Sequence, residues 1–179
     1  WTPEKLAVFI SRKLNINPDS PFHQHIKVAP KNSSVLFEAN NRDTWEVSTA
    51  TVVMGILGLI SSNPKRDRVE MQQTSIWKGR SRKMLSNIRD TSPLRSDFIN
   101  LKDQSIFNLV IDFFNSVKKQ LWINNPSDSY IFKTVGIQAL FDTLKLKLKS
   151  ETEKKFSDID FEDLLSTVKD IDFKDKFFQ

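Results

Sequence analysis

Apolar side chains recur at helical spacing at the beginning of the chain. The stripe consists of Leu6, Ala7, Phe9, Ile10 and Leu14. Residues three or four apart lie on one face of an α-helix, so this spacing predicts an amphipathic helix. Thr2 can accept hydrogen bonds from the free amides of its first turn, and Pro3 suits the first helical position. We expect the helix to end at Asn15 to Asn17, before Pro18.

Short β-like runs follow, separated by turn-forming residues. The runs are Ile26 to Ala29, Val35 to Ala39 and Trp45 to Val47. They predict a small hairpin or a three-stranded patch. After the patch, Ser48 or Thr49 can cap a helix that continues to Ile60. Because this helix is apolar along most of its length, we expect it to be buried, although Gly55 lowers its intrinsic helix propensity.

The clearest helical pattern extends from about Gln104 to Trp122. Its apolar positions are Ile106, Val110, Phe113, Phe114, Val117 and Leu121. Asp103 is a good N-cap residue for this helix, and the turn formers Asn124, Asn125 and Pro126 end it.

A second strong pattern, from Ile131 to Lys149, follows the cap candidates Ser127 and Asp128. Gly136 interrupts this pattern, which indicates that another backbone packs closely there. A short helix is predicted at Phe161 to Val168. These elements predict a mainly α fold with a small β hairpin or patch (α+β) and about five helices around one core.

The chain of 179 residues is long enough for one domain with a core of its own. We expect residues 1–150 to form a helical portion with a basic loop at 63–95, and residues 151–179 to form an acidic, Phe-rich tail. Because Trp1 is not a natural first residue, we also expect this chain to be a fragment of a larger α/β protein whose upstream half is missing.

Charge is concentrated in segment 63–95, which holds nine Lys or Arg residues against three acidic ones, a net charge of +6. Its weak periodicity predicts a loop with one short helix. Basic side chains neutralise phosphates, and an aromatic ring beside them can stack on a base. The candidate nucleic-acid-binding residues are Lys65, Arg66, Arg68, Trp77, Lys78, Arg80, Arg82 and Lys83. The alternative is an ordinary surface loop that Trp77 anchors to the core.

The acidic end of the chain offers a different function. Residues 151–179 contain nine acidic residues against five lysines, and five Phe residues. These side chains could dock on a protein partner or on a missing segment of the same protein. The alternative function is therefore a non-enzymatic interaction module that binds a partner through this tail.

Candidate chemistry is sparse. There is no cysteine, and His23 and His25 are the only histidines, without a carboxylate pair beside them. We therefore predict no catalytic residue, no metal site and no cofactor in this portion. A nuclease or nucleotide hydrolase with its catalytic residues upstream is a third possibility. No apolar run approaches the roughly 18 residues of a membrane span, and no signal sequence is recognisable, so we expect a cytoplasmic protein without membrane contact.

Three stretches together resemble a known family. The first is the helix of Leu6 to Asn15, continued by Asn17 to Phe22 and Ile26-Lys27. The second is Val47 to Val53, and the third is Lys133 to Phe141, preceded by a helix with Phe113-Phe114 and Trp122. In this order they are similar to the C-terminal half of the DGQHR-domain proteins, a prokaryotic family related to the ParB-like and sulfiredoxin-like fold.

The resemblance implies a protein associated with DNA modification, phage defence or mobile elements, since some members resemble repressors of DNA phosphorothioation genes. The Asp-Gly-Gln-His-Arg signature that names the family is absent from this sequence. In relatives it lies upstream of the opening helix, so no signature residue can be carried over. The expected function is an accessory or regulatory DNA-associated protein that binds DNA through its basic loop.

Overall fold

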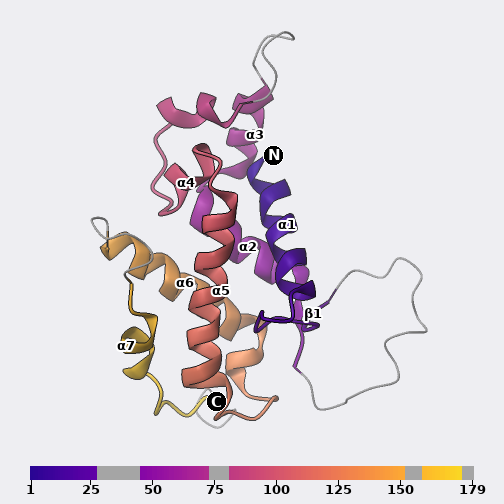
Figure 1. Cartoon of the computed structure of the whole chain (residues 1–179), viewed down its shortest axis with the longest axis vertical. Helices are drawn as coiled ribbons and strands as arrows, with labels where there is room; N and C mark the ends of the chain where they lie inside the picture. The colour runs from indigo at the N-terminus through magenta and orange to yellow at the C-terminus, as the bar shows by residue number, and fades with distance from the viewer. Residues whose placement is uncertain (28–44, 73–80, 152–158, 175–179) are drawn as a thin grey trace, which may run out of the picture.

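The computed structural model describes residues 1–27, 45–72, 81–151 and 159–174, which are predominantly helical (Figure 1). The α-helices are α1 (Pro3–Ile16), α2 (Thr49–Ile60), α3 (Pro64–Gln72), α4 (Arg95–Ile99), α5 (Asp103–Val117), α6 (Thr134–Ser150) and α7 (Phe161–Ser166). The remaining elements are the 3-10 helices η1 (Arg82–Asn87) and η3 (Tyr130–Phe132), the π-helical turn η2 (Lys118–Trp122), and the strands β1 (Ile26–Lys27) and β2 (Val47–Ser48). The predicted class, mainly α with a small β patch, is confirmed.

Helix α1 begins and ends where its capping residues predict. The Thr2 hydroxyl accepts a hydrogen bond from the Lys5 amide at 3.4 Å, and Asn17 ends the helix. The predicted stripe is buried with one exception. Phe9 is 44% exposed and packs on the Trp1 ring, with a centroid distance of 4.6 Å. Leu6 and Ile10 lie near the centre of the apolar face of α1. At 100° per residue, Phe9 lies at the edge of this face, so its side chain stays outside the core.

The β patch is a parallel pair in which Ile26 lies opposite Val47. The hairpin that the sequence predicts is therefore wrong for these two strands, since a tight turn can join only antiparallel strands. The chain enters β1 through a sharp turn at Gln24, which has a φ of 61°. The Asn15 side chain accepts a hydrogen bond from the Ile26 amide at 2.9 Å and ties β1 to the end of α1. The predicted run Val35 to Ala39 lies outside the described residues.

Helix α2 lies between α1 and α6 and is buried as predicted (Figure 1). The Ser48 hydroxyl caps it by accepting a hydrogen bond from the Thr51 amide at 3.1 Å. Gly55 faces α6 so closely that a Cβ atom there would lie 2.3 Å from the Phe141 ring. The residue that weakens the helix in isolation therefore permits its packing.

Two helix starts differ from the prediction. Asp103 begins α5 without a capping hydrogen bond, because its carboxylate binds Arg82 instead. Helix α6 starts at Thr134 rather than at Ile131, after the separate turn η3. The close backbone contact predicted at Gly136 is confirmed, since a Cβ atom there would lie 2.3 Å from the Tyr130 carbonyl oxygen.

The basic segment contains more helix than the prediction of a loop with one short helix. It contains α3, η1 and Arg95, the first residue of α4, and residues 73–80 lie outside the described ranges. The acidic tail packs on the body of the same chain through α7, whose Phe161 is 6% exposed and lies 5.3 Å from Phe113 between ring centroids. Leu165 is also buried. These two tail residues therefore belong to the core.

Candidate functional site

Helix α3 carries three of the predicted basic residues on a short, well-capped element. The Asn63 side chain accepts a hydrogen bond from the Arg66 amide at 3.1 Å, as an N-terminal capping residue does. Lys65 is exposed, and the side chains of Arg66 and Arg68 are 38% and 50% exposed. All three side chains are therefore accessible to solvent.

A buried ion pair holds α3 on α4. The Asp67 carboxylate is fully buried and accepts two hydrogen bonds from Arg95, one of them at 2.9 Å, and another from the Ser61 hydroxyl at 2.5 Å. Removing one member of such a pair leaves an uncompensated buried charge. Asp67 and Arg95 therefore have a structural role, and Arg95 is unavailable to an external anion.

Arg82 is also held inside the molecule. Its side chain is 3% exposed and forms a bidentate pair with Asp103, while its Nε and Nη1 atoms donate to the carbonyl oxygens of Trp1 and Phe98 at 3.0 Å. The guanidinium also lies over the Phe98 ring, 4.2 Å from its centroid. These contacts use the donors that would bind a phosphate, so Arg82 is removed from the candidate contacts.

Asp90 fixes the loop between η1 and α4. It accepts hydrogen bonds from the backbone amides of Ser92 and Ser62 at 2.8 and 2.9 Å, and from the Ser62 hydroxyl at 2.7 Å. Burial alone would raise the pKa of Asp90, but these hydrogen bonds outweigh it and lower the pKa to about 2. Asp90 is therefore ionised at neutral pH, where its carboxylate lies 3.8 Å from Arg66.

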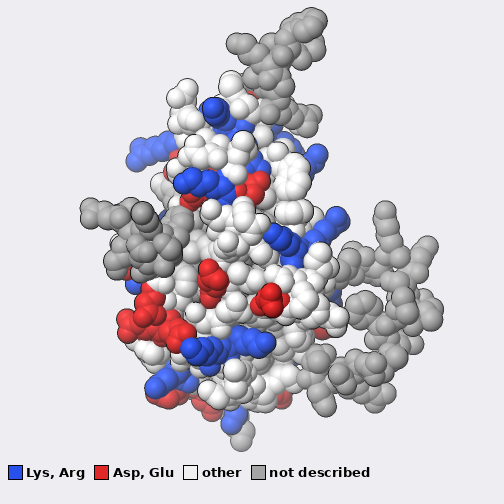
Figure 2. Space-filling view, in the orientation of Figure 1, with Lys and Arg blue, Asp and Glu red and all other residues white. Residues whose placement is uncertain are grey.

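Three basic side chains remain without an acidic partner among the described residues of the segment. Lys65, Lys83 and Arg89 are exposed, and Arg66 donates to the Arg89 carbonyl oxygen at 3.4 Å, which places α3 beside the loop after η1. Arg68 shares its charge with Glu4, 3.6 Å away. Figure 2 shows Lys and Arg side chains over the upper part of the molecule, where α3 and α4 lie, and acidic groups near α7.

We call Lys65, Arg66, Arg68, Lys83 and Arg89 the basic region. Its members come from α3, from η1 and from the loop before α4. Of the predicted binding residues, Trp77, Lys78 and Arg80 lie outside the described residues. Arg89 is a new member, which the sequence showed only as one basic residue among nine.

The arrangement suits charge neutralisation. Across the part of the chain that the structure describes, no three His, Asp or Glu side chains are grouped so that they could hold a metal ion. No helix within the described ranges is both long enough and apolar enough to cross a membrane. Exposed Lys and Arg side chains bind anions such as phosphates by charge and by hydrogen bonding.

Comparison with known proteins identified no relative of this chain. Neither a scan against protein-family models nor searches of curated proteins and of solved structures found a match to this chain.

Proposed function

We propose that this chain is an accessory or regulatory part of a cytoplasmic, DNA-associated protein of the DGQHR type, and that it binds nucleic acid through the basic region. The observation that carries the proposal is the division of the basic side chains into two groups. Arg82 and Arg95 are buried against Asp103 and Asp67, whereas Lys65, Lys83 and Arg89 are exposed without an acidic partner among the described residues.

Unpaired surface cations have a physical consequence for binding. Each Lys or Arg that neutralises a phosphate releases condensed counterions, so the affinity depends steeply on salt. Because the basic region consists of exposed Lys and Arg side chains, contact with the backbone phosphates is the favoured mode. We therefore expect binding with little dependence on DNA sequence from these residues.

Fluorescence anisotropy of labelled duplex and single-stranded DNA tests the proposal. We expect micromolar affinity at low salt and a fall of about a hundredfold or more between about 50 and 200 mM salt, if the contacts number about four or more. A triple variant, Lys65→Gln with Lys83→Gln and Arg89→Gln, should weaken binding by more than about tenfold at low salt and reduce the salt slope by about 2 to 3.

A matched triple variant separates local contact from net charge. Lys149→Gln with Lys169→Gln and Lys174→Gln removes the same charge from exposed positions on α6 and on the tail. These lysines lie outside the basic region, so this variant should bind almost as tightly as the unaltered chain. Equal weakening by both triples, or no binding by the unaltered chain at low salt, would contradict the proposal.

The alternative, an interaction module that docks through the tail, rests on fewer described residues. Ile171 is 41% exposed, and Phe156, Phe177 and Phe178 lie outside the described residues. Three other apolar residues of the tail, Ile159, Phe161 and Leu165, are buried, and α7 packs on α5 and η2 of the same chain. These three side chains therefore pack within the same chain.

A further inference from the structure

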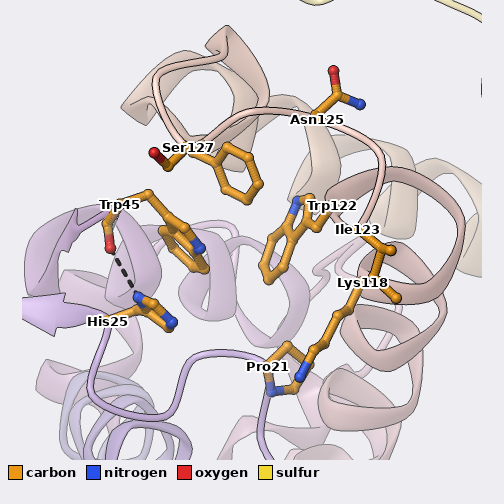
Figure 3. Close-up of a pocket in the computed structure, with 9 residues that line it drawn as sticks. Pro21, His25, Trp45, Lys118, Trp122, Ile123, Asn125 and Ser127 are labelled. Carbon is orange, nitrogen blue, oxygen red and sulfur yellow. Dashed lines mark hydrogen bonds between the residues drawn. The ribbon is translucent and has the colours of Figure 1, made fainter. Parts of the chain in front are cut away.

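A cleft of about 260 Å³ lies beside the start of β1 (Figure 3). His25 and Trp45, which come just before β1 and β2, line one side of it. Lys118 and Trp122, the two ends of η2, line the other side. Phe132 of η3 also lines the cleft. The basic region includes α3, which lies in the upper part of Figure 1, whereas β1 lies in the lower half. The cleft shares no residue with the basic region.

The aromatic wall of the cleft is already assembled. The Trp45 ring lies 4.8 Å from Trp122 and 5.1 Å from Phe132 between centroids, and Phe132 lies 5.6 Å from Trp122. Phe22 supports Trp122 from the core at 5.6 Å. Because these rings pack against one another, their side chains would have to move little when a flat apolar ligand binds.

His25 contributes a hydrogen-bond acceptor to the cleft. Its ring stacks on Trp45 at 4.2 Å with an angle of 5°, and its Nδ1 lies 2.8 Å from the Trp45 carbonyl oxygen. A carbonyl oxygen only accepts, so Nδ1 carries the hydrogen and Nε2 keeps its lone pair when the ring is neutral. Burial, followed by the charge of Lys118, lowers the pKa of His25 despite the opposing Trp45 hydrogen bond, so the neutral ring dominates at neutral pH.

Trp122 contributes to the aromatic lining. Its side chain is 6% exposed, and its indole Nε1 is buried without a hydrogen-bond acceptor among the described residues. The indole Nε1 is thus enclosed by protein atoms, and Trp122 lines the cleft as part of its aromatic surface. Lys118 is exposed and forms no ion pair with a described residue, and its side chain extends along the cleft toward Pro21 in Figure 3.

We propose that this cleft binds a single nucleotide, with its base against the wall of Trp45, Trp122 and Phe132 and its phosphate at Lys118. A base is planar and carries hydrogen-bond donors on its edge, which complement the acceptor His25 Nε2. The volume lies just below the range of about 300 to 1,000 Å³ that drug-sized ligands occupy, so a dinucleotide cofactor is too large. The nucleotide is either free or an unpaired unit of a strand.

The indole N–H resonance of Trp122 in a two-dimensional NMR spectrum reports on the cleft directly, and the Trp122→Phe variant assigns it. Titration with adenosine and uridine monophosphates should shift this resonance with a saturating curve and a Kd of about 0.1 to 1 mM. The corresponding nucleosides should bind more weakly, because they lack the phosphate for Lys118. If a single-stranded trinucleotide binds more tightly than the mononucleotide, the site accepts a nucleotide of a strand. If the two bind equally tightly, the site accepts a free nucleotide.

Two neighbouring lysines provide a matched pair of variants. Lys118→Gln should weaken mononucleotide binding by about tenfold, as loss of a charged hydrogen bond predicts. Lys119→Gln makes the same charge change at a lysine that pairs with Glu162 at 2.7 Å and does not line the cleft, and it should leave the Kd unchanged. Both positions are exposed, so both variants should fold.

The proposal is overturned by three results. The first is an unshifted Trp122 resonance at a mononucleotide concentration of about 10 mM, well above the expected Kd. The second is an equal response to inorganic phosphate alone, which would leave no role for the base. The third is an equal effect of Lys118→Gln and Lys119→Gln. The triple variant of the basic region should retain mononucleotide binding, so failure of the proposed DNA binding and failure of this site are distinguishable.

Discussion

The guanidinium of Arg82 donates hydrogen bonds to the carboxylate of Asp103, with Nη2 3.0 Å from Oδ2. This pair joins η1 to the first turn of α5. The same group holds the carbonyl oxygens of Trp1 and Phe98. One side chain therefore connects the N-terminal residue to η1, α4 and α5. This explains why a basic residue inside a segment of net charge +6 faces inward.

Arg82→Ala should destabilise the protein by about 3 kcal/mol, because it leaves the half-buried Asp103 carboxylate without its partner. Arg82→Lys should also destabilise it, since an ammonium group cannot reproduce the planar, bidentate geometry. Urea unfolding followed by tryptophan fluorescence measures both changes. The neighbouring variant Lys83→Ala, at an exposed position, should change stability by less than about 0.5 kcal/mol. Equal midpoints for Arg82→Ala and the unaltered chain would refute the structural role.

The lowered pKa of Asp90 should make the free energy of unfolding depend on pH. Its pKa in the folded protein, about 2, lies below the ordinary value of 3.8. Asp90 therefore stabilises the fold above about pH 4, and this contribution is lost as the pH falls toward 2. Asp90→Asn should cost about 1 kcal/mol at pH 7, after allowance for solvent screening, and much less near pH 2.

Urea unfolding at pH 7 and at about pH 2.5 checks this dependence. The control is Asp128→Asn, at an exposed carboxylate that forms no hydrogen bond or ion pair with the described residues. It should have a small effect at both pH values. A loss of stability for Asp90→Asn that is as large at low pH as at pH 7 would contradict the role given to its ionised form.

Two glycines in α2 should respond to alanine in opposite directions. A Cβ atom at Gly55 would lie 2.3 Å from the Phe141 ring, whereas one at Gly58 would meet only the Lys145 Nζ atom at 3.7 Å. Gly58→Ala should raise the free energy of unfolding by about 0.5 to 1 kcal/mol, since alanine favours a helix. Gly55→Ala should lower it by about 1 to 3 kcal/mol through overpacking. Thermal unfolding gives both values, and a stabilising Gly55→Ala would show that α2 and α6 are not in this contact.

The sequence determined the local starts and stops of several elements. Thr2 and Asn17 mark the two ends of α1, Ser48 caps α2, and Gly136 marks a close backbone contact. These features depend on hydrogen bonds and dihedral preferences of residues within a few positions of each other. Helical spacing likewise predicted the buried face of α5, because a long periodic pattern specifies which side chains share a face.

Only the tertiary structure decided which charges are internal and where a cleft forms. Asp103 suits a helix cap by its position, yet it binds Arg82, 21 residues earlier, and Asp67 binds Arg95, 28 residues later. The cleft brings His25 and Trp45 to Lys118 and Trp122, far along the chain. No local rule specifies such pairings, because they arise from the way that helices pack. The sequence therefore determined the local elements of this protein, and packing selected the side chains that remain free to bind a ligand.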